Sequence, residues 1–170
     1  LGDVYKRQDY ENATVTDING ETRQFVPAEY SIKNDLYSQN QIDFIDKYLN
    51  NLFKIVYEAC ENGKYYKFDE NYDLVDSDVT TAEEAVSNVM DINSVRDMYI
   101  LYEIVHDYDC GEGSFYMCVD FSKDSKCPKL KFTSPWDFNW AYNDSTEKYY
   151  AGAFTDKNFV AKKGDRSNPW

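Results

Sequence analysis

The sequence predicts an α+β fold, and three observations carry this prediction. Between Ile42 and Val56, apolar residues recur at the spacing of one helix face. Residues 114–120 and 129–134 have instead the character of two strands joined by a polar link. The chain has 170 residues, of which 17% are aromatic, so it can build one domain with a hydrophobic core.

The chain is strongly acidic, with 31 acidic residues, 18 basic residues and a formal net charge of -13. This charge excludes nonspecific binding to nucleic acids or anionic membranes, which requires fields of Lys and Arg. The carboxylates could hold divalent cations, or they could serve only solubility. No run of about 18 apolar residues occurs, so the sequence predicts no transmembrane segment.

The first half of the chain predicts a hairpin followed by a long helix. Residues 10–30 mix β-branched side chains around the turn sequence "DING" (Asp17–Gly20), which favours a short hairpin. Ser38 and Gln41 form a capping box, and the helix that follows runs to about Cys60, where "ENG" supplies a glycine stop. Its apolar positions are Ile42, Ile45, Leu49, Leu52, Phe53 and Val56.

Residues 64–78 are rich in Tyr and Asp and are predicted to form a solvated acidic loop. The segment "DENYDLVDSD" (Asp69–Asp78) has the acids of a calcium-binding loop. It lacks the glycine at the sixth position and the glutamate at the twelfth that an EF-hand requires. We therefore expect no calcium site there.

Two shorter helices come next, and the pattern then changes to strands. The first helix begins within Thr80–Thr81, where an acid three residues on completes a capping box, and it ends near Val89. The second begins at Asp91 or Asn93 and ends near His106, whose imidazole is expected to complement the helix dipole. Two strands and their polar link then predict a hairpin.

The four cysteines do not indicate a zinc site, because none has C-x-x-C spacing and the chain holds a single histidine. Cys118 and Cys127 flank the turn of the predicted hairpin. They could form a disulfide if the protein is exported, or they could remain free, packed thiols. The spacing alone leaves both alternatives open.

Two acidic turns bracket this hairpin, namely "HDYDCGEG" (His106–Gly113) and "PWDFN" (Pro135–Asn139). A hairpin that leaves one turn and returns to the other is expected to bring Asp109 close to Asp137. Neighbouring carboxylates repel unless a cation lies between them, and Mg²⁺ or Mn²⁺ prefers such oxygen ligands. The apolar residues around Asp137 are expected to fix its rotamer and exclude water, with Trp136 in the core or turn packing.

Protein kinases use the same order of elements. A catalytic-loop Asp follows a helix, two short strands come next, and a second Asp in a D-F-G turn holds the metal. Asp109 stands where the catalytic-loop Asp would be, and Asp137 stands in the place of the D-F-G Asp. Ser114 occupies the position of the Asn that kinases carry five residues after the catalytic Asp.

The segments "LYEIVHDYDCGEGSFYM" and "PWDFNWAYN" resemble the spore coat protein H (CotH) kinase family. The resemblance is close over Leu101–Asn143 and looser back to about Tyr30. It implies an atypical protein-kinase-like fold, of which this chain would be mainly the helical C-lobe with a β-hairpin between two acidic turns. It also implies transfer of the ATP γ-phosphoryl group to Ser or Thr of protein substrates, in the extracellular space, at the cell surface or in the spore coat.

The resemblance implies a role for each acid. Asp109 would be catalytic and Asp137 would bind Mg²⁺ or Mn²⁺. Asp107 stands where the family has Asn, and it could be a second metal ligand or hold the turn. Asn139 replaces the second Asp of D-F-D and is a weaker metal ligand, while Ser114 could offer an oxygen to the cofactor site. Further departures from the family pattern include Ser134, which replaces a Gly.

The first eight residues are expected to be artificial, and the other end is expected to be a truncation. "LGDVYKRQ" (residues 1–8) back-translates, in one reading, to CTGGGAGATGTGTATAAGAGACAG, which contains a transposon end used to prepare sequencing libraries, so we expect an adapter artefact there. Residues 9–170 would then be a partial CotH-like domain, truncated before the start and after Trp170. The phosphate-binding Lys of a kinase would lie upstream, and the fragment alone would be inactive.

Two other interpretations compete with a kinase. An Asp in a turn usually serves turn chemistry alone, by bonding the nearby backbone. A pseudokinase or extracellular adhesion module could use the same scaffold without catalysis. A glycosidase built on paired carboxylates is a weaker alternative, because nothing in the sequence supplies a sugar cleft.

Overall fold

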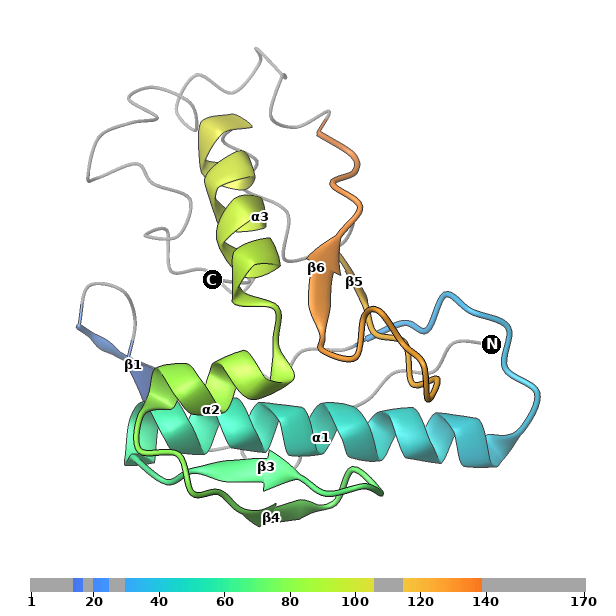
Figure 1. Cartoon of the computed structure of the whole chain (residues 1–170). Coiled ribbons are helices and arrows are strands. Elements are labelled where there is room, and N and C mark those ends of the chain that lie inside the picture. The colour runs from blue at the N-terminus through green and yellow to red at the C-terminus, as the bar shows by residue number, and fades with distance from the viewer. Residues whose placement is uncertain (1–13, 17–19, 25–29, 106–114, 139–170) are drawn as a thin grey trace. The chain divides into compact units, whose positions relative to one another are not determined.

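The computed structural model describes residues 14–16, 20–24, 30–105 and 115–138 (Figure 1). These residues form small antiparallel hairpins and three α-helices, which confirms the α+β class among the described parts of the chain. The elements separate into two units, one with β1, β2, α1, β3, β4 and α2, and the other with α3, β5 and β6. In the described residues, no helix is both long and apolar enough to cross a membrane.

The long helix α1 (Gln39–Asn62) begins and ends where local signals place its caps. The Ser38–Gln41 capping box is formed, and Gln41 Oε1 accepts the backbone N–H of Ser38 at 3.2 Å. Gly63 ends the helix with a φ of 61°, a left-handed conformation that suits glycine. The predicted start is therefore confirmed, and the helix extends slightly beyond the expected end at Cys60.

The hairpin predicted near "DING" is present as β1 (Thr14–Thr16) and β2 (Thr22–Gln24), with Thr14 opposite Gln24. Two side chains of α1 anchor it. Glu61 accepts from the backbone N–H and the hydroxyl of Thr16, both at 3.1 Å, and the Tyr57 hydroxyl donates to the Thr14 carbonyl at 3.0 Å.

The loop predicted for residues 64–78 is wrong, because a second hairpin forms there. Strands β3 (Tyr66–Phe68) and β4 (Leu74–Asp76) pair antiparallel, with Tyr66 opposite Asp76. These strands have three residues each, too few for an alternating pattern to appear in the sequence. Their pairing depends on the turn between them and on aromatic contacts with α1.

Asp69 stabilises this turn through hydrogen bonds to the turn's own backbone. Its Oδ1 accepts the backbone N–H groups of Asn71 and Asp73 at 2.8 and 2.9 Å, and its own N–H donates to the Asp73 carbonyl at 2.9 Å. This is the local bonding by which an Asp side chain replaces backbone partners in a turn. The acid that opens the "DENYDLVDSD" segment therefore organises the hairpin.

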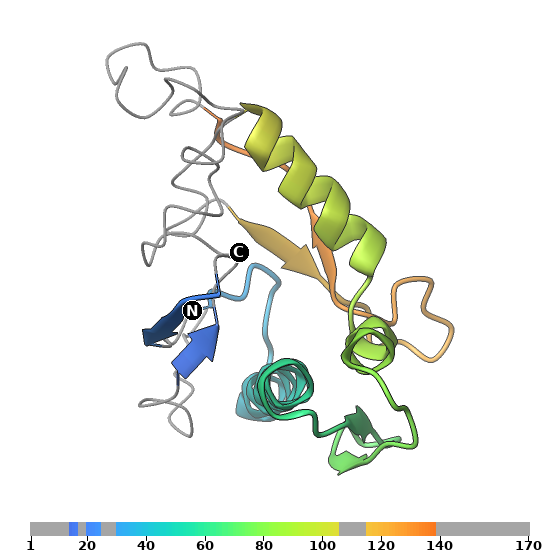
Figure 2. The same ribbon diagram turned by 90° about the vertical axis from the view of Figure 1, so that its left-hand side faces the viewer.

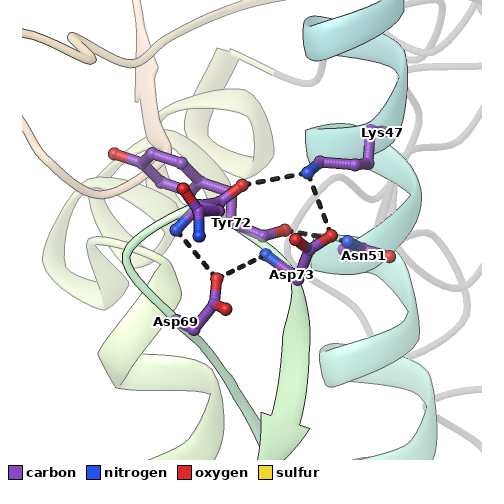
Figure 3. Close-up of polar contacts among 6 residues, drawn as sticks. Lys47, Asn51, Asp69, Tyr72 and Asp73 are labelled. Carbon is purple, nitrogen blue, oxygen red and sulfur yellow. Dashed lines mark hydrogen bonds and ion pairs between the residues drawn. The ribbon is translucent and has the colours of Figure 1, made fainter.

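Two side chains of α1 hold the same turn from outside (Figure 3). Lys47 Nζ donates to the Asn71 carbonyl at 3.0 Å and to Asp73 Oδ1 at 2.9 Å. Asn51 Nδ2 donates to the Tyr72 carbonyl at 2.9 Å. These bonds join residues more than twenty positions apart, which explains why no local pattern reveals the hairpin.

Replacing Asp69 by alanine is expected to lower the free energy of unfolding by about 1–2 kcal/mol, because two backbone N–H groups lose their acceptor. Asp73→Ala is the matched control. Its exposed side chain pairs with a half-buried Lys47 whose ammonium group reaches solvent, so its loss should cost less than about 0.5 kcal/mol. Urea titrations measure the free energy of unfolding of the two variants, and equal unfolding midpoints would contradict this role for Asp69.

An aromatic cluster covers the centre of α1. Tyr48 is 1% exposed and stacks on Phe68, with ring centroids 5.3 Å apart. Tyr72 meets Tyr48 and Phe44 edge to face, both at 5.6 Å. The buried face of α1 follows the helical spacing Tyr48, Leu52, Ile55 and Ala59.

Helix α2 (Ala82–Val89) packs against α1 and β3 through Ala85 and Val89. The predicted N-cap is confirmed at the later of the two candidate positions, since Thr81 Oγ1 accepts the Glu84 N–H at 3.2 Å. The Glu84 carboxylate reaches back to the Thr80 N–H and the Thr81 hydroxyl, both at 3.2 Å, in a close variant of the capping box.

The second unit is built from α3 (Ile92–Val105), β5 (Tyr116–Cys118) and β6 (Lys131–Thr133) (Figure 2). Asp91 caps α3, since its Oδ1 accepts the Ser94 N–H at 3.2 Å. The two strands pair antiparallel, with Tyr116 opposite Thr133, which confirms the predicted hairpin. Helix α3 lies along β6, as both views show.

The start of α3 is bonded to β6. The Asp91 N–H donates to the Leu130 carbonyl at 2.9 Å, and the Phe132 N–H donates to Ser94 Oγ at 3.0 Å. Leu130 is 5% exposed and Ser94 is 8% exposed, so these bonds are shielded from water. They fix the hairpin on the helix and thereby position the turn that follows β6.

Candidate functional site

The structure describes one of the five predicted site residues, which is Asp137. Asp107, Asp109, Ser114 and Asn139 lie outside the described residues. The predicted order of helix and hairpin is confirmed on both sides of the first acidic turn. The predicted closeness of Asp109 and Asp137 stays a prediction.

Asp137 lies four positions after the last residue of β6, in a turn with unusual backbone angles. Ser134 has a φ of 52° and Asp137 a φ of 65°, so two non-glycine residues of this turn are left-handed. Asp is among the few residues that tolerate this conformation, because its short polar side chain can bond locally. Turn geometry alone therefore gives one reason for an Asp at position 137.

The residues on either side of Asp137 face different surroundings. The Phe138 ring packs on Tyr102 of α3, with centroids 5.3 Å apart. Trp136 is 62% exposed, and the Asp137 side chain is exposed as well. The expectation that Trp136 belongs to the packing and that water is excluded from Asp137 is therefore wrong. The left-handed residues turn the chain so that Phe138 faces the core.

Tyr102 is the centre of the packing beneath this turn. It is 0% exposed and contacts Phe115 at 5.8 Å, in addition to Phe138. Phe115 in turn meets Phe132 of β6 edge to face at 5.0 Å. Tyr102 thus links α3 both to Phe115, just before β5, and to Phe138, just after Asp137.

Helix α3 also carries a buried acid. Glu103, next to Tyr102, is 7% exposed. Burial raises the pKa of the Tyr99 hydroxyl, and the negative charge of Glu103 raises that pKa further. Tyr99 therefore remains protonated through the physiological range and can donate a hydrogen bond beside this acid.

The donor chemistry at Asp137 is compatible with a nucleotide-bound cation. Within the described ranges, no group of three or more His, Cys, Asp or Glu side chains could hold a metal ion. Mg²⁺ does not require such a group, because it commonly takes one or two carboxylates together with phosphate oxygens and water. The exposed carboxylate of Asp137 can supply one such ligand.

Position 134 has a backbone conformation that suits glycine better than the serine it carries. The φ of Ser134 is 52°, in the region that favours glycine, which is the residue that the sequence resemblance predicts at this position. A glycine meets no Cβ penalty in that conformation.

Ser134→Gly is accordingly expected to keep or raise the free energy of unfolding, by up to about 1 kcal/mol. Thr133→Gly is the matched control, because it places glycine inside β6 and should lower stability by about 0.5–1 kcal/mol. Thermal or urea unfolding of both variants measures the difference. A larger loss for Ser134→Gly than for Thr133→Gly would show that backbone strain does not govern position 134.

Comparisons of the chain with protein-family models, with curated proteins and with solved structures found no match. What the structure gives is an α+β class and a defined turn around Asp137. The kinase-like fold and the CotH assignment therefore remain predictions from the sequence motifs.

Proposed function

We propose that the chain is part of an ATP- and divalent-metal-dependent protein kinase of the CotH type, which transfers the ATP γ-phosphoryl group to Ser or Thr hydroxyls of proteins. One observation carries the proposal. In the turn that follows the β5–β6 hairpin, Asp137 is exposed while the next residue, Phe138, packs on α3. The D-F-G turn of protein kinases has the same arrangement, in which the Asp binds the metal and the Phe packs against the protein.

The proposed reaction forms a bond between the acceptor oxygen and the γ-phosphorus and breaks the bond from that phosphorus to the β,γ-bridging oxygen. ADP leaves, and the acceptor proton passes late to Asp109. A bound Mg²⁺ or Mn²⁺ ion would neutralise charge on the ATP phosphates. Asp137 would hold that ion, with Asn139, Asp107 and Ser114 as further oxygen donors.

Positioning and charge account for catalysis in such a site, because phosphoryl transfer needs little covalent chemistry from the protein. The packing of Phe138 on Tyr102 supports this part of the proposal, since it fixes the backbone beside Asp137. The bonds between α3 and β6 then fix that backbone to the helix that precedes Asp109 in the sequence.

A second candidate, a non-catalytic binding or adhesion module, is favoured by the exposure of Trp136. A tryptophan that is 62% exposed beside an exposed acid offers a surface for a partner. The two candidates differ in chemistry, so one assay separates them.

The test uses the complete reading frame recovered from the source DNA. The purified protein is incubated with γ-phosphate-labelled ATP and Mg²⁺ or Mn²⁺, with a chelator as control. We expect label on Ser or Thr of protein, and its loss with the chelator. Absence of label from a folded protein that carries an upstream phosphate-binding Lys would favour the binding module.

A further inference from the structure

Two cysteine sulfurs lie close together in the β5–β6 hairpin. Cys118 Sγ, on the last residue of β5, is 3.9 Å from Cys127 Sγ, on the segment that leads into β6. Both thiols are reachable from solvent, since Cys118 is exposed and Cys127 is half-buried. Both belong to one hairpin, so their separation does not depend on how the two units of the chain are placed.

The backbone holds the two cysteines in this arrangement. Cys118 is paired with Lys131 in the strand register, and the Asp120 N–H donates to the Cys127 carbonyl at 2.9 Å. The Cys127 N–H donates to Ser125 Oγ at 2.9 Å. These hydrogen bonds hold the segment before β6 beside the end of β5, and so they keep the two sulfurs close together.

We infer that Cys118 and Cys127 form a dithiol–disulfide pair, which closes when the protein meets a disulfide oxidant such as oxidised glutathione. A disulfide requires a separation of about 2.0 Å between the sulfurs, so they must approach by about 1.9 Å. Rotation of a cysteine side chain between its staggered conformations supplies a movement of this size.

The disulfide forms by thiol–disulfide exchange with oxidised glutathione. One thiolate attacks a sulfur of oxidised glutathione and releases one glutathione thiolate, which leaves a mixed disulfide. The second cysteine thiolate then attacks the protein sulfur of that mixed disulfide and releases the second glutathione. Two protein thiols are oxidised to one disulfide, and one oxidised glutathione is reduced to two thiols.

The electrostatics predict how the rate depends on pH. Burial raises the pKa of the Cys118 thiol, the hydrogen bond and charge of Cys127 raise it further, and the charge of Lys131 opposes them. The thiolate is the nucleophile, so its small fraction at neutral pH slows attack by Cys118. Ring closure should therefore become faster as the pH rises towards that pKa.

The disulfide would close a loop around the residues between positions 118 and 127 and restrict the unfolded chain. The oxidised protein should therefore melt at least about 5 °C above the reduced protein. This inference is independent of the proposed phosphoryl transfer, because none of its measurements depends on kinase activity.

The test oxidises the chain carrying Cys60→Ser, which removes an exposed cysteine of the other unit. The protein is equilibrated in a buffer with oxidised glutathione in excess over reduced glutathione and then alkylated, and its mass is measured by mass spectrometry. We expect two thiols to escape alkylation. Combined trypsin and chymotrypsin digestion should then yield Met117–Phe121 joined to Cys127–Lys129, and this cross-link should disappear on reduction.

Three matched variants in the same background complete the test. Cys110→Ser should keep the cross-link, whereas Cys118→Ser and Cys127→Ser should each lose it. Full alkylation of Cys118 and Cys127 in the oxidising buffer would overturn the inference, and so would a cross-link that joins either of them to Cys110 instead. Both results come from the parent chain, so they do not depend on whether a variant folds.

Discussion

Asp137→Asn in the complete protein is expected to lower phosphoryl transfer by at least about 10²-fold, the loss typical when one electrostatic group of an active site is removed. The reason is that the variant loses the carboxylate proposed to hold the ATP-bound cation. Asparagine is preferable to alanine here, because the φ of 65° at this position is tolerated by Asn but strains other side chains. The measurement is initial-rate transfer of labelled phosphate to protein at several metal concentrations.

Asp124→Asn is the matched control, since Asp124 is an exposed acid in the link between β5 and β6. It removes the same charge from the same hairpin and should leave the transfer rate unchanged. Near-normal transfer by Asp137→Asn would show that Asp137 does not hold the metal. Equal losses in both variants would attribute the effect to overall charge.

Tyr102→Ala is expected to lower the free energy of unfolding of the second unit by about 3–5 kcal/mol, because it removes a fully buried aromatic ring. The lost ring contacts Phe115 and Phe138, so the hairpin and the turn at Asp137 lose their common support. Urea unfolding measures the loss, and hydrogen exchange locates it. We expect protection to fall chiefly in α3, β5 and β6.

Two controls separate burial from a general effect on α3. Ile104→Ala truncates a side chain of the same helix that is 59% exposed and should cost less than about 1 kcal/mol. Tyr102→Phe keeps the ring and should retain most of the stability. If Tyr102→Ala unfolds at the same urea concentration as Ile104→Ala, Tyr102 is not the centre of this core.

Much of the secondary structure was predictable because its signals are local. The Ser38–Gln41 box, Gly63 and the Thr81 N-cap each act within a few residues of a helix end, and each is formed. The hairpin of β5 and β6 was also visible, since both strands carry strand-forming residues around a polar link. For the candidate site, the order of helix, hairpin and acidic turn was predictable on the same grounds.

The hairpin of β3 and β4 was not predictable, because its stabilising contacts come from α1. Lys47 and Asn51 hold its turn, and Tyr48 stacks on Phe68. Such contacts join residues far apart in the sequence, where neither propensity nor periodicity reports them. The same limit applies to Trp136, whose aromatic character indicated burial although the turn leaves it exposed.

The sequence by itself determined the acidic character of this protein, its α+β class, its helix ends and the position of Asp137 in the turn after a strand. Those properties follow from composition and from interactions within a few residues. Only the tertiary structure decided which aromatic residues are buried, how Asp137 and Phe138 divide between surface and core, and that the sulfurs of Cys118 and Cys127 lie 3.9 Å apart. These depend on long-range packing, in which each side chain competes for the space that the other elements leave.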